Sequence, residues 1–257
     1  MQLIVPMAGL GQRFVDAGYD LPKPLIPVGG VPMVVQVVND LPAATRIVFI
    51  VHPAHEQRYE IGKSLRNCFP ACRVVVAPGL TQGQACTVRL AESEIDLDED
   101  VLVAACDATH LYDAGRFDQL RRGTAAQCIV WTYRGEPRVL EKPTAYGWVR
   151  TAAGRDDLLE VSCKRPISSN LLNDPVVSGF FWFRSARTML AAIDKMVAEN
   201  RRVNGEFYMD VVPNLLIESG RQAIQFQVQK YIGWGTPHDL EDYERWQNYF
   251  RNLRAAA

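Results

Sequence analysis

The chain has 257 residues, of which 48% are hydrophobic and 22% are charged, and its formal net charge is -1. This composition is typical of a globular protein, and the length suits one large domain or two fused halves. The balance of 28 basic and 29 acidic residues argues against a nucleic-acid-binding surface. An anionic ligand would therefore need a local cluster of cations.

No apolar run reaches membrane-spanning length, and the first eight residues resemble a strand rather than a signal peptide. We therefore expect no membrane partner. The six cysteines are scattered, most of them within apolar segments, which is typical of buried thiols in a cytoplasmic protein. The sequence leaves the oligomeric state open, a homo-oligomer included.

The first half of the chain alternates between apolar runs rich in β-branched residues and helix-like segments. Strands are predicted at Leu3–Val5, Ile47–Val51, Arg73–Val76, Val101–Ala105 and Cys128–Thr132, and helices at Pro32–Asp40, Ala54–Leu65, Gln84–Ser93 and Ala114–Arg122. This alternation predicts an α/β fold, Rossmann-like, with a mixed, mostly parallel central sheet flanked by helices. Ligands of such sheets bind at the carboxyl ends of the strands.

The second half has a different pattern but no polar linker before it. Strands are predicted at Tyr146–Arg150, Leu158–Ser162, Val176–Phe183 and Ala223–Val228, and helices at Ala186–Glu199, Glu206–Glu218 and Pro237–Arg254. Because nothing in the composition separates the halves, we expect one domain over 1–257 with a shared sheet and cleft.

A glycine-rich turn, Ala8-Gly9-Leu10-Gly11, follows the first predicted strand. Free N–H groups in such a turn can hold phosphate oxygens, although a purely structural turn has the same pattern. Arg13 supplies a forked cation, and Lys23, between two prolines, supplies a point charge. The turn matches neither the dinucleotide fingerprint, which has a third glycine in place of Phe14, nor a Walker-type loop.

The segment GLGQRF, followed by PKPLIPVGGVPMV, resembles the signature of the sugar-1-phosphate nucleotidylyltransferase family, of the NTP transferase type. The resemblance extends to about residue 243. It implies a Rossmann-like nucleotidyltransferase domain in which 1–135 bind the nucleoside triphosphate and 136–257 bind a phosphorylated acceptor. It also implies Mg²⁺ as cofactor, and Ala8 to Gly11 as nucleotide contacts with Arg13 and Lys23 as catalytic residues.

Asp107 follows the apolar run Val101–Ala105 and is a natural magnesium ligand at a strand end, although it could instead cap the next element. The family has an aspartate at this place. Many members have a second metal-binding aspartate before a late Gly-Thr-Pro turn, but here that position is Gly233. Either one carboxylate and the phosphates hold the metal, or Asp210 or Asp239 substitutes.

Further segments resemble the family's base-binding and acceptor-binding motifs. They imply nucleotide contacts from Gln82 and Gly83, and acceptor contacts from Gly147, Lys164, Gly179 and Glu206. Lys164 lies where the family has Glu-Lys-Pro, but Cys163 replaces the glutamate. Lys142, in a literal Glu-Lys-Pro, is the alternative, although it precedes the Tyr-Gly motif and is therefore in the wrong order.

The resemblance predicts transfer of a nucleoside monophosphate to a sugar 1-phosphate. The segments 164–168, 173–174 and 233–237 are most similar to the capsule and surface-polysaccharide branch. Related members use choline phosphate or phosphonates as acceptors. A quaternary ammonium would need an aromatic cage, and the candidate rings are Trp148, Phe181, Trp182 and Tyr208. A nucleotide-binding pseudoenzyme is a third hypothesis, because the second aspartate is missing.

Overall fold

The computed structural model describes residues 1–255; residues 256–257 of the predicted domain lie outside this range. The strands are β1 Gln2–Met7, β2 Pro27–Val28, β3 Val31–Pro32, β4 Arg46–Val51, β5 Arg73–Val76, β6 Val101–Val103, β7 Ala108–Leu111, β8 Cys128–Tyr133, β9 Gly147–Thr151, β10 Leu158–Cys163, β11 Val176–Phe183, β12 Ala223–Gln227 and β13 Lys230–Gly233. The α-helices are α1 Gln12–Asp16, α2 Met33–Asn39, α3 Pro53–Tyr59, α4 Ile61–Cys68, α5 Gln84–Arg89, α6 Ala114–Gly123, α7 Ala186–Ala198, α8 Val212–Glu218 and α9 Pro237–Ala255.

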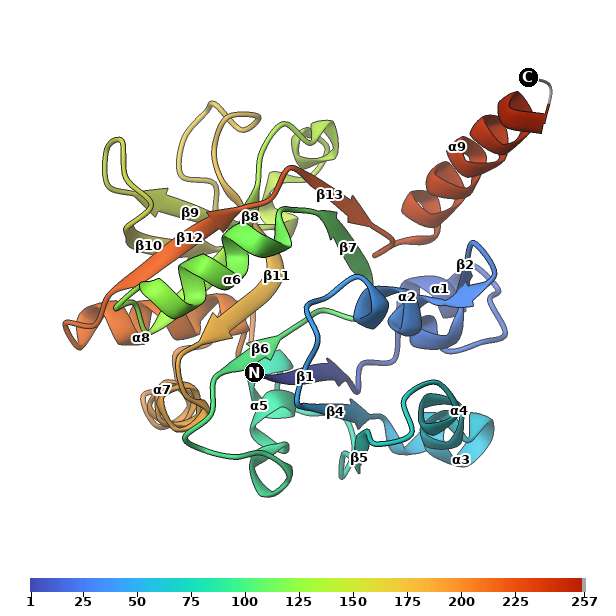
Figure 1. The fold of residues 1–257 in the computed structure, drawn as a ribbon, viewed down its shortest axis with the longest axis horizontal. Coiled ribbons are helices and arrows are strands. Elements are labelled where there is room, and N and C mark those ends of the chain that lie inside the picture. The colour runs from blue at the N-terminus through green and yellow to red at the C-terminus, as the bar shows by residue number, and fades with distance from the viewer. Residues whose placement is uncertain (256–257) are drawn as a thin grey trace.

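A nine-stranded mixed sheet forms the centre of the molecule, with the path β10-β9-β11-β6-β1-β4-β5 and with β8 and β12 joined through β11. The first-half strands β1, β4, β5 and β6 are parallel to one another. Strand β11 of the second half runs antiparallel to both β6 and β8. The predicted α/β class with a mostly parallel central sheet flanked by helices is confirmed (Figure 1).

Apolar side chains alternate between the two faces of the sheet, as the period of two in a strand requires. Leu3 and Val5 of β1 point into one core cluster, together with apolar residues of α2, α4 and α6. Ile4 points into the other, with residues of α5, α7 and α8. The result is a three-layer arrangement, and Figure 1 shows α6 lying across β8 and β12.

Two predicted helices differ from the structure. The segment Ala54–Leu65 is not one helix, because Glu60 adopts a left-handed conformation (φ 48°) that ends α3 and begins α4. The segment Glu206–Glu218 is helical only from a 3-10 turn at Met209–Val211 and then α8. Glu206 instead pairs its backbone with Val203 in an isolated bridge, so it is not in the first turn of a helix.

The small sheet formed by β7 and β13, which pair antiparallel, was not predicted. It carries the site, because Asp107 lies between the end of β6 and the start of β7. The expectation of buried thiols is wrong for Cys68, which is exposed, whereas Cys72 and Cys128 are buried. No helix in the described range is long and apolar enough to cross a membrane.

Candidate active site

The amino-terminal turn leaves β1 at its carboxyl end and lines a cavity of about 480 Å³, here called the loop cavity. Within residues 1–255, no backbone hydrogen bond uses the N–H of Gly9, Leu10 or Gly11. Gly11 has φ +67°, and a Cβ there would lie 3.0 Å from the Cβ of Lys23. The turn thus needs glycine at this position, and its N–H groups are available to a ligand.

Lys23 lies at the start of a 3-10 turn, and its ammonium donates to Asp107 Oδ2. Burial lowers the pKa of Lys23, but the charge and hydrogen bond of Asp107 outweigh this and raise it above 10.5. The lysine therefore stays charged. Burial and the nearby Asp107 charge raise the pKa of the Cys106 thiol to about 12, so a thiolate nucleophile is excluded at neutral pH.

The wall of the loop cavity opposite the turn is the segment 80–84. Gly83, at φ +127°, packs so closely on the Phe207 backbone that a Cβ would lie 2.6 Å from its N and O atoms. The Phe207 N–H donates to the carbonyl of Gln82, and the Ala85 N–H donates to the Phe207 carbonyl. These bonds fix Gln82 and Gly83, the predicted base contacts, at the cavity wall.

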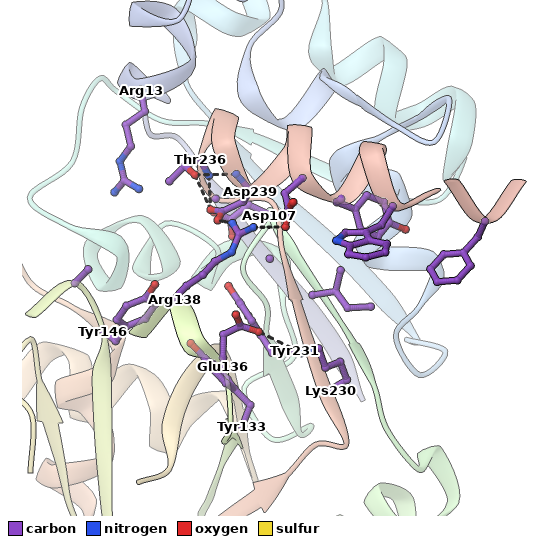
Figure 2. A pocket seen from close by; sticks show the side chains of 18 residues that line it. Arg13, Asp107, Tyr133, Glu136, Arg138, Tyr146, Lys230, Tyr231, Thr236 and Asp239 are labelled. Carbon is purple, nitrogen blue, oxygen red and sulfur yellow. Dashed lines mark hydrogen bonds and ion pairs between the residues drawn. The ribbon is translucent and has the colours of Figure 1, made fainter. Parts of the chain in front are cut away.

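A second cavity of about 720 Å³, here called the aromatic cavity, is lined in part by Asp107 (Figure 2). It combines rings and charges: its lining includes Arg13, Asp107, Tyr133, Glu136, Arg138, Tyr146, Lys230, Tyr231, Asp239, Asp242, Tyr243, Trp246 and Phe250. The rings of Tyr133 and Tyr231 are stacked, with centroids 4.3 Å apart.

Most charges of the aromatic cavity are paired. Arg138 forms ion pairs with Asp239 and Asp242, and Lys230 lies 3.3 Å from Glu136. Arg13 has no ion-pair partner among the residues of the described range, and Figure 2 shows it reaching toward the cavity apart from the others. A cation without a protein counterion is suited to an anionic ligand.

The loop cavity and the aromatic cavity meet at the Lys23–Asp107 pair. Lys23 lines the loop cavity and Asp107 lines the aromatic cavity. Two ligands, one in each cavity, would therefore face each other across one ammonium and one carboxylate. This arrangement suits a reaction between two bound anions, because charge at the junction can be neutralised on both sides.

The structure separates the four predicted acceptor residues. Lys164 donates to the carbonyl of Ala145, a residue of the aromatic-cavity wall, and its Nζ lies 5.0 Å from the Tyr208 ring centroid. Gly147 packs against Asp210. Gly179 (φ +88°) faces Ala105 in an irregular part of β11.

Glu206, predicted to contact the acceptor, instead lines the loop cavity, on the predicted nucleotide side. The alternative Lys142 is exposed at the surface.

Of the two candidate second carboxylates, Asp239 lies near Asp107. A Cβ at Gly235 would lie 3.5 Å from Asp107 Oδ2 and 3.9 Å from Asp239 Oδ2, so these oxygens are less than 8 Å apart. Asp210 lies elsewhere, beside Gly147 and with Lys164 as its charge partner. Burial raises the pKa of Asp210, which makes it a poorer metal ligand.

The oxygen donors at the junction fit Mg²⁺, which commonly takes one or two carboxylates and fills its remaining positions with phosphates and water. Asp107 is the freer of the two carboxylates, because its Oδ2 accepts from Lys23 but its Oδ1 accepts no hydrogen bond within residues 1–255. Asp239 already accepts hydrogen bonds from the Thr236 N–H and hydroxyl and pairs with Arg138. Over residues 1–255 there is no group of three or more metal-binding side chains. These residues fit a single-carboxylate site.

The prediction of an aromatic cage is wrong for three of its four rings. Trp148, Phe181 and Trp182 are fully buried in the core, because they alternate into the two faces of the sheet. Tyr208 is half-buried beside Lys164. His110 lines neither cavity: burial lowers its pKa to about 3, its ring packs 4.4 Å from Phe180, and its buried Nε2 has no hydrogen-bond partner within residues 1–255.

Sequence reasoning missed several residues that line the cavities. Arg202 donates to the side-chain oxygen of Gln82, and its guanidinium lies 4.0 Å above the Phe207 ring. Glu136 and Arg138 belong to the aromatic cavity. The short run Arg201-Arg202 was a visible signal for a cation near the loop cavity. Nothing in the neighbouring sequence indicated that Arg202 would bind Gln82, which is 120 residues away.

Comparisons with known proteins agree with this geometry. Residues 3–204 match the model of the MobA-like NTP transferase domain. The chain is 32% identical over 230 residues to the bifunctional protein GlmU of Leifsonia xyli subsp. xyli, covering 86% of this chain and 43% of that protein. It thus spans less than half the length of this relative.

Two solved structures have the same fold. A nucleoside-diphosphate-sugar pyrophosphorylase from Vibrio cholerae matches with a TM-score of 0.79 and 22% identity, covering 95% of this chain and 99% of that one. An inositol-1-phosphate CTP transferase from T. maritima matches with a TM-score of 0.71 and 16% identity, covering 95% and 93%. The family match covers most of the chain, and the chain therefore belongs to the family of MobA-like NTP transferase domains, a nucleotidyltransferase family, as its sequence predicted.

Proposed function

We propose that the protein transfers a nucleoside monophosphate from a nucleoside triphosphate to a phosphorylated small molecule, with a sugar 1-phosphate as the first candidate acceptor. An oxygen of the acceptor phosphate attacks the α-phosphorus. The bond from the α-phosphorus to the oxygen bridging to the β-phosphorus breaks, and pyrophosphate leaves. The product would be an activated sugar, which we propose is used in making surface polysaccharide.

The observation that carries this proposal is the meeting of the two cavities at Lys23 and Asp107. We assign the triphosphate to the loop cavity, because the free N–H groups of the glycine turn line it. The acceptor belongs in the aromatic cavity, with its phosphate toward the junction. In-line attack needs these two anions to be held in contact, and a shared junction provides that positioning.

The junction must supply positive charge, because both proposed ligands are anions. Two unit charges 4 Å apart repel by ~1 kcal/mol in water and by ~4 kcal/mol in a partly dry cleft. Several such pairs form when a triphosphate meets a phosphate, so the repulsion exceeds ordinary binding contacts. Arg13 and Lys23 are the cations placed to offset it. A magnesium ion on Asp107 would, when bound, neutralise phosphate charge as well.

Truncation of the two cations tests their roles. Lys23→Ala and Arg13→Ala should each slow turnover by ~10²–10³-fold if the cations stabilise charge that develops in the transition state. The measurement is pyrophosphate release at saturating substrates. Lys63→Ala is the matched control, because Lys63 is an exposed lysine of α4 that pairs with Glu60 and lines neither cavity. Near-normal turnover in both truncated variants would contradict the assignment.

A second candidate acceptor is a phosphate or phosphonate that carries an amine or quaternary ammonium. The rings of the aromatic cavity and the carboxylate of Glu136 favour it, because cations bind ring faces and carboxylates. The half-buried rings of Tyr146 and Tyr231 take the place of the cage rings predicted from the sequence, and Tyr133, only 2% exposed, stacks behind Tyr231.

One substrate panel separates these candidates. Each of four nucleoside triphosphates is combined with sugar 1-phosphates, phosphocholine and aminoethylphosphonate, and pyrophosphate release is measured. Turnover with a sugar 1-phosphate alone supports the first candidate, and turnover with the cationic acceptors alone supports the second. Tight nucleotide binding without pyrophosphate release for any acceptor would contradict both and identify a nucleotide-binding pseudoenzyme.

A further inference from the structure

Lys23 and Asp107 are each other's partners at the junction of the two cavities. Within residues 1–255, neither side chain forms another ion pair or another side-chain hydrogen bond. Their side chains are only 18% and 25% exposed, so water and salt screen this pair less than they screen a surface pair. The ammonium of Lys23 therefore neutralises the same carboxylate that fits Mg²⁺.

The stem of Lys23 is held in place, but its ammonium can turn. A 3-10 turn with prolines on both sides of Lys23 stiffens the backbone. The stem packs on Gly11, where a Cβ would lie 3.0 Å from Lys23 Cβ and 3.9 Å from Lys23 Cδ. Because Lys23 also lines the loop cavity, rotation about its terminal bonds would carry the ammonium from Asp107 toward a phosphate bound at the glycine turn.

The single carboxylate of Asp107 cannot hold both cations tightly. With the ammonium on Oδ2, a divalent ion on Oδ1 would lie close to it, and their repulsion grows with the product of the two charges. The neighbouring carboxylate of Asp239 offers little compensation, because it already pairs with Arg138 and accepts from Thr236. Lys23 must therefore leave Asp107 before Mg²⁺ can bind there tightly.

A triphosphate in the loop cavity would draw the ammonium of Lys23 away from Asp107. Ammonium groups bind phosphate oxygens, and the free N–H groups of the glycine turn would hold such oxygens in the cavity that Lys23 lines. Once Lys23 has turned to the phosphates, Asp107 has lost its counterion and can accept a divalent cation. Binding of the nucleotide and of the metal then favour each other, because such coupling is reciprocal.

We propose that Lys23 and Mg²⁺ exchange places on Asp107. Lys23 blocks the metal site until a triphosphate draws its ammonium onto the phosphates, so the metal site is complete only when nucleotide is present. The triphosphate as trigger rests on the proposed function, whereas the competition between Lys23 and the metal for Asp107 does not. Two binding experiments test these two parts separately, and neither needs turnover.

The first test is Mn²⁺ binding to the full-length protein without nucleotide, followed by the electron paramagnetic resonance signal of free Mn²⁺. Mn²⁺ suits the same oxygen ligands as Mg²⁺. Lys23→Met removes the charge and keeps an unbranched stem, and it should lower the Kd for Mn²⁺ by about tenfold or more. Asp107→Asn added to that variant should abolish the gain.

Arg13→Met is the matched control for Lys23→Met. Arg13 is a cation that lines the aromatic cavity beside Asp107, but it forms no ion pair with that carboxylate. Its loss should therefore change the Kd for Mn²⁺ much less. The competition would be overturned by equal Kd values in wild type and Lys23→Met, by an equal gain in Arg13→Met, or by a gain that survives Asp107→Asn.

The second test measures nucleotide binding by isothermal titration in EDTA, with each of four nucleoside triphosphates. Asp107→Asn should bind a triphosphate about tenfold more tightly than wild type, because Lys23 no longer leaves a charged partner. In the Lys23→Met background, the same substitution should have little effect. Glu206→Gln is the matched control, because Glu206 is a carboxylate of the loop cavity without an ion pair to Lys23.

The results of the titration separate the exchange from the proposed function. An equal gain in Glu206→Gln, or an undiminished gain in the Lys23→Met background, would show a general charge effect and overturn the exchange. Absence of triphosphate binding in wild type and in every variant would contradict the proposed function and the trigger with it. The Mn²⁺ measurement would still decide whether Lys23 and a divalent cation compete for Asp107.

Discussion

Gly11 couples the backbone of the amino-terminal turn to the position of Lys23. Its φ of +67° is costly for any side chain, and a Cβ would press on the Lys23 side chain at 3.0 Å. We expect Gly11→Ala to lower the free energy of unfolding by about 1–2 kcal/mol and to slow pyrophosphate release by shifting Lys23. Gly18→Ala is the control, because Gly18 has φ +81° but open space around it. It should lose similar stability and keep its activity; equal activity losses would contradict the coupling.

Arg202 holds Gln82 in one orientation. Its guanidinium donates a hydrogen bond to the side-chain oxygen of Gln82. The amide NH₂ of Gln82 is therefore left to donate to the acceptor atoms of a base. Arg202→Ala should raise KM for the triphosphate about tenfold, which corresponds to one lost hydrogen bond, with a smaller effect on kcat. Arg201→Ala is the control, because Arg201 pairs with Glu199 and Glu218. An unchanged KM in Arg202→Ala would show that Arg202 does not orient Gln82 for nucleotide binding.

Residues differed in how far the sequence could predict them. Lys23 and Asp107 were predictable because each follows a strong local signal, a glycine turn or the end of a buried strand. Their ion pair confirms only that the fold brings the two side chains together, and their roles stay predictions. Arg202 could not be predicted, because its meaning depends on Gln82, far away in the sequence. Trp148 was misassigned because a buried ring and a ligand-binding ring have the same sequence pattern.

At the scale of elements, the strands were the most predictable part. Runs such as Arg73–Val76 and Val176–Phe183 match β5 and β11, since β-branched and aromatic residues at a period of two favour strands. Strands β7 and β13 were missed because, unlike the equally short β5, neither contains a run of β-branched residues. The break between α3 and α4 was missed because the left-handed residue is a glutamate, Glu60, and the nearest glycine, Gly62, lies inside α4.

That break leads to a prediction about stability. Glu60 has φ 48°, a conformation that costs a side chain about 1 kcal/mol and glycine almost nothing. Glu60→Gly should therefore raise the free energy of unfolding by about 1 kcal/mol, because the exposed pair with Lys63 that it loses contributes little. Urea unfolding measures the change. Glu60→Ala keeps the unfavourable conformation and should show no gain; a gain as large as that of glycine would mean that backbone strain is not the cause.

At the scale of the whole molecule, the sheet order determines where the site forms. Strand β11 returns antiparallel beside β6 and carries the second half onto the sheet of the first. Segments far apart in the sequence thereby reach one junction: the loop after β6 supplies Asp107, and the turn after β13 supplies Gly235. The sequence predicted the α/β class from alternation, but not this order, because strand pairing depends on packing between distant segments. The division into halves at 135 stays a prediction.

The stability of the whole fold toward acid should depend on His110. Its ring is buried among Trp131, Phe180 and Tyr231, and burial lowers its pKa from 6.5 to about 3. Below pH 6.5 the unfolded chain binds a proton that the folded protein does not. Stability is therefore complete above pH 6.5 and falls, by up to about 1.4 kcal/mol per pH unit, as the pH drops toward 3. His110→Phe should flatten this decline in urea unfolding measured between pH 7 and 4. The exposed His238→Gln control should not, and an equally steep decline in His110→Phe would show that other groups set the acid limit.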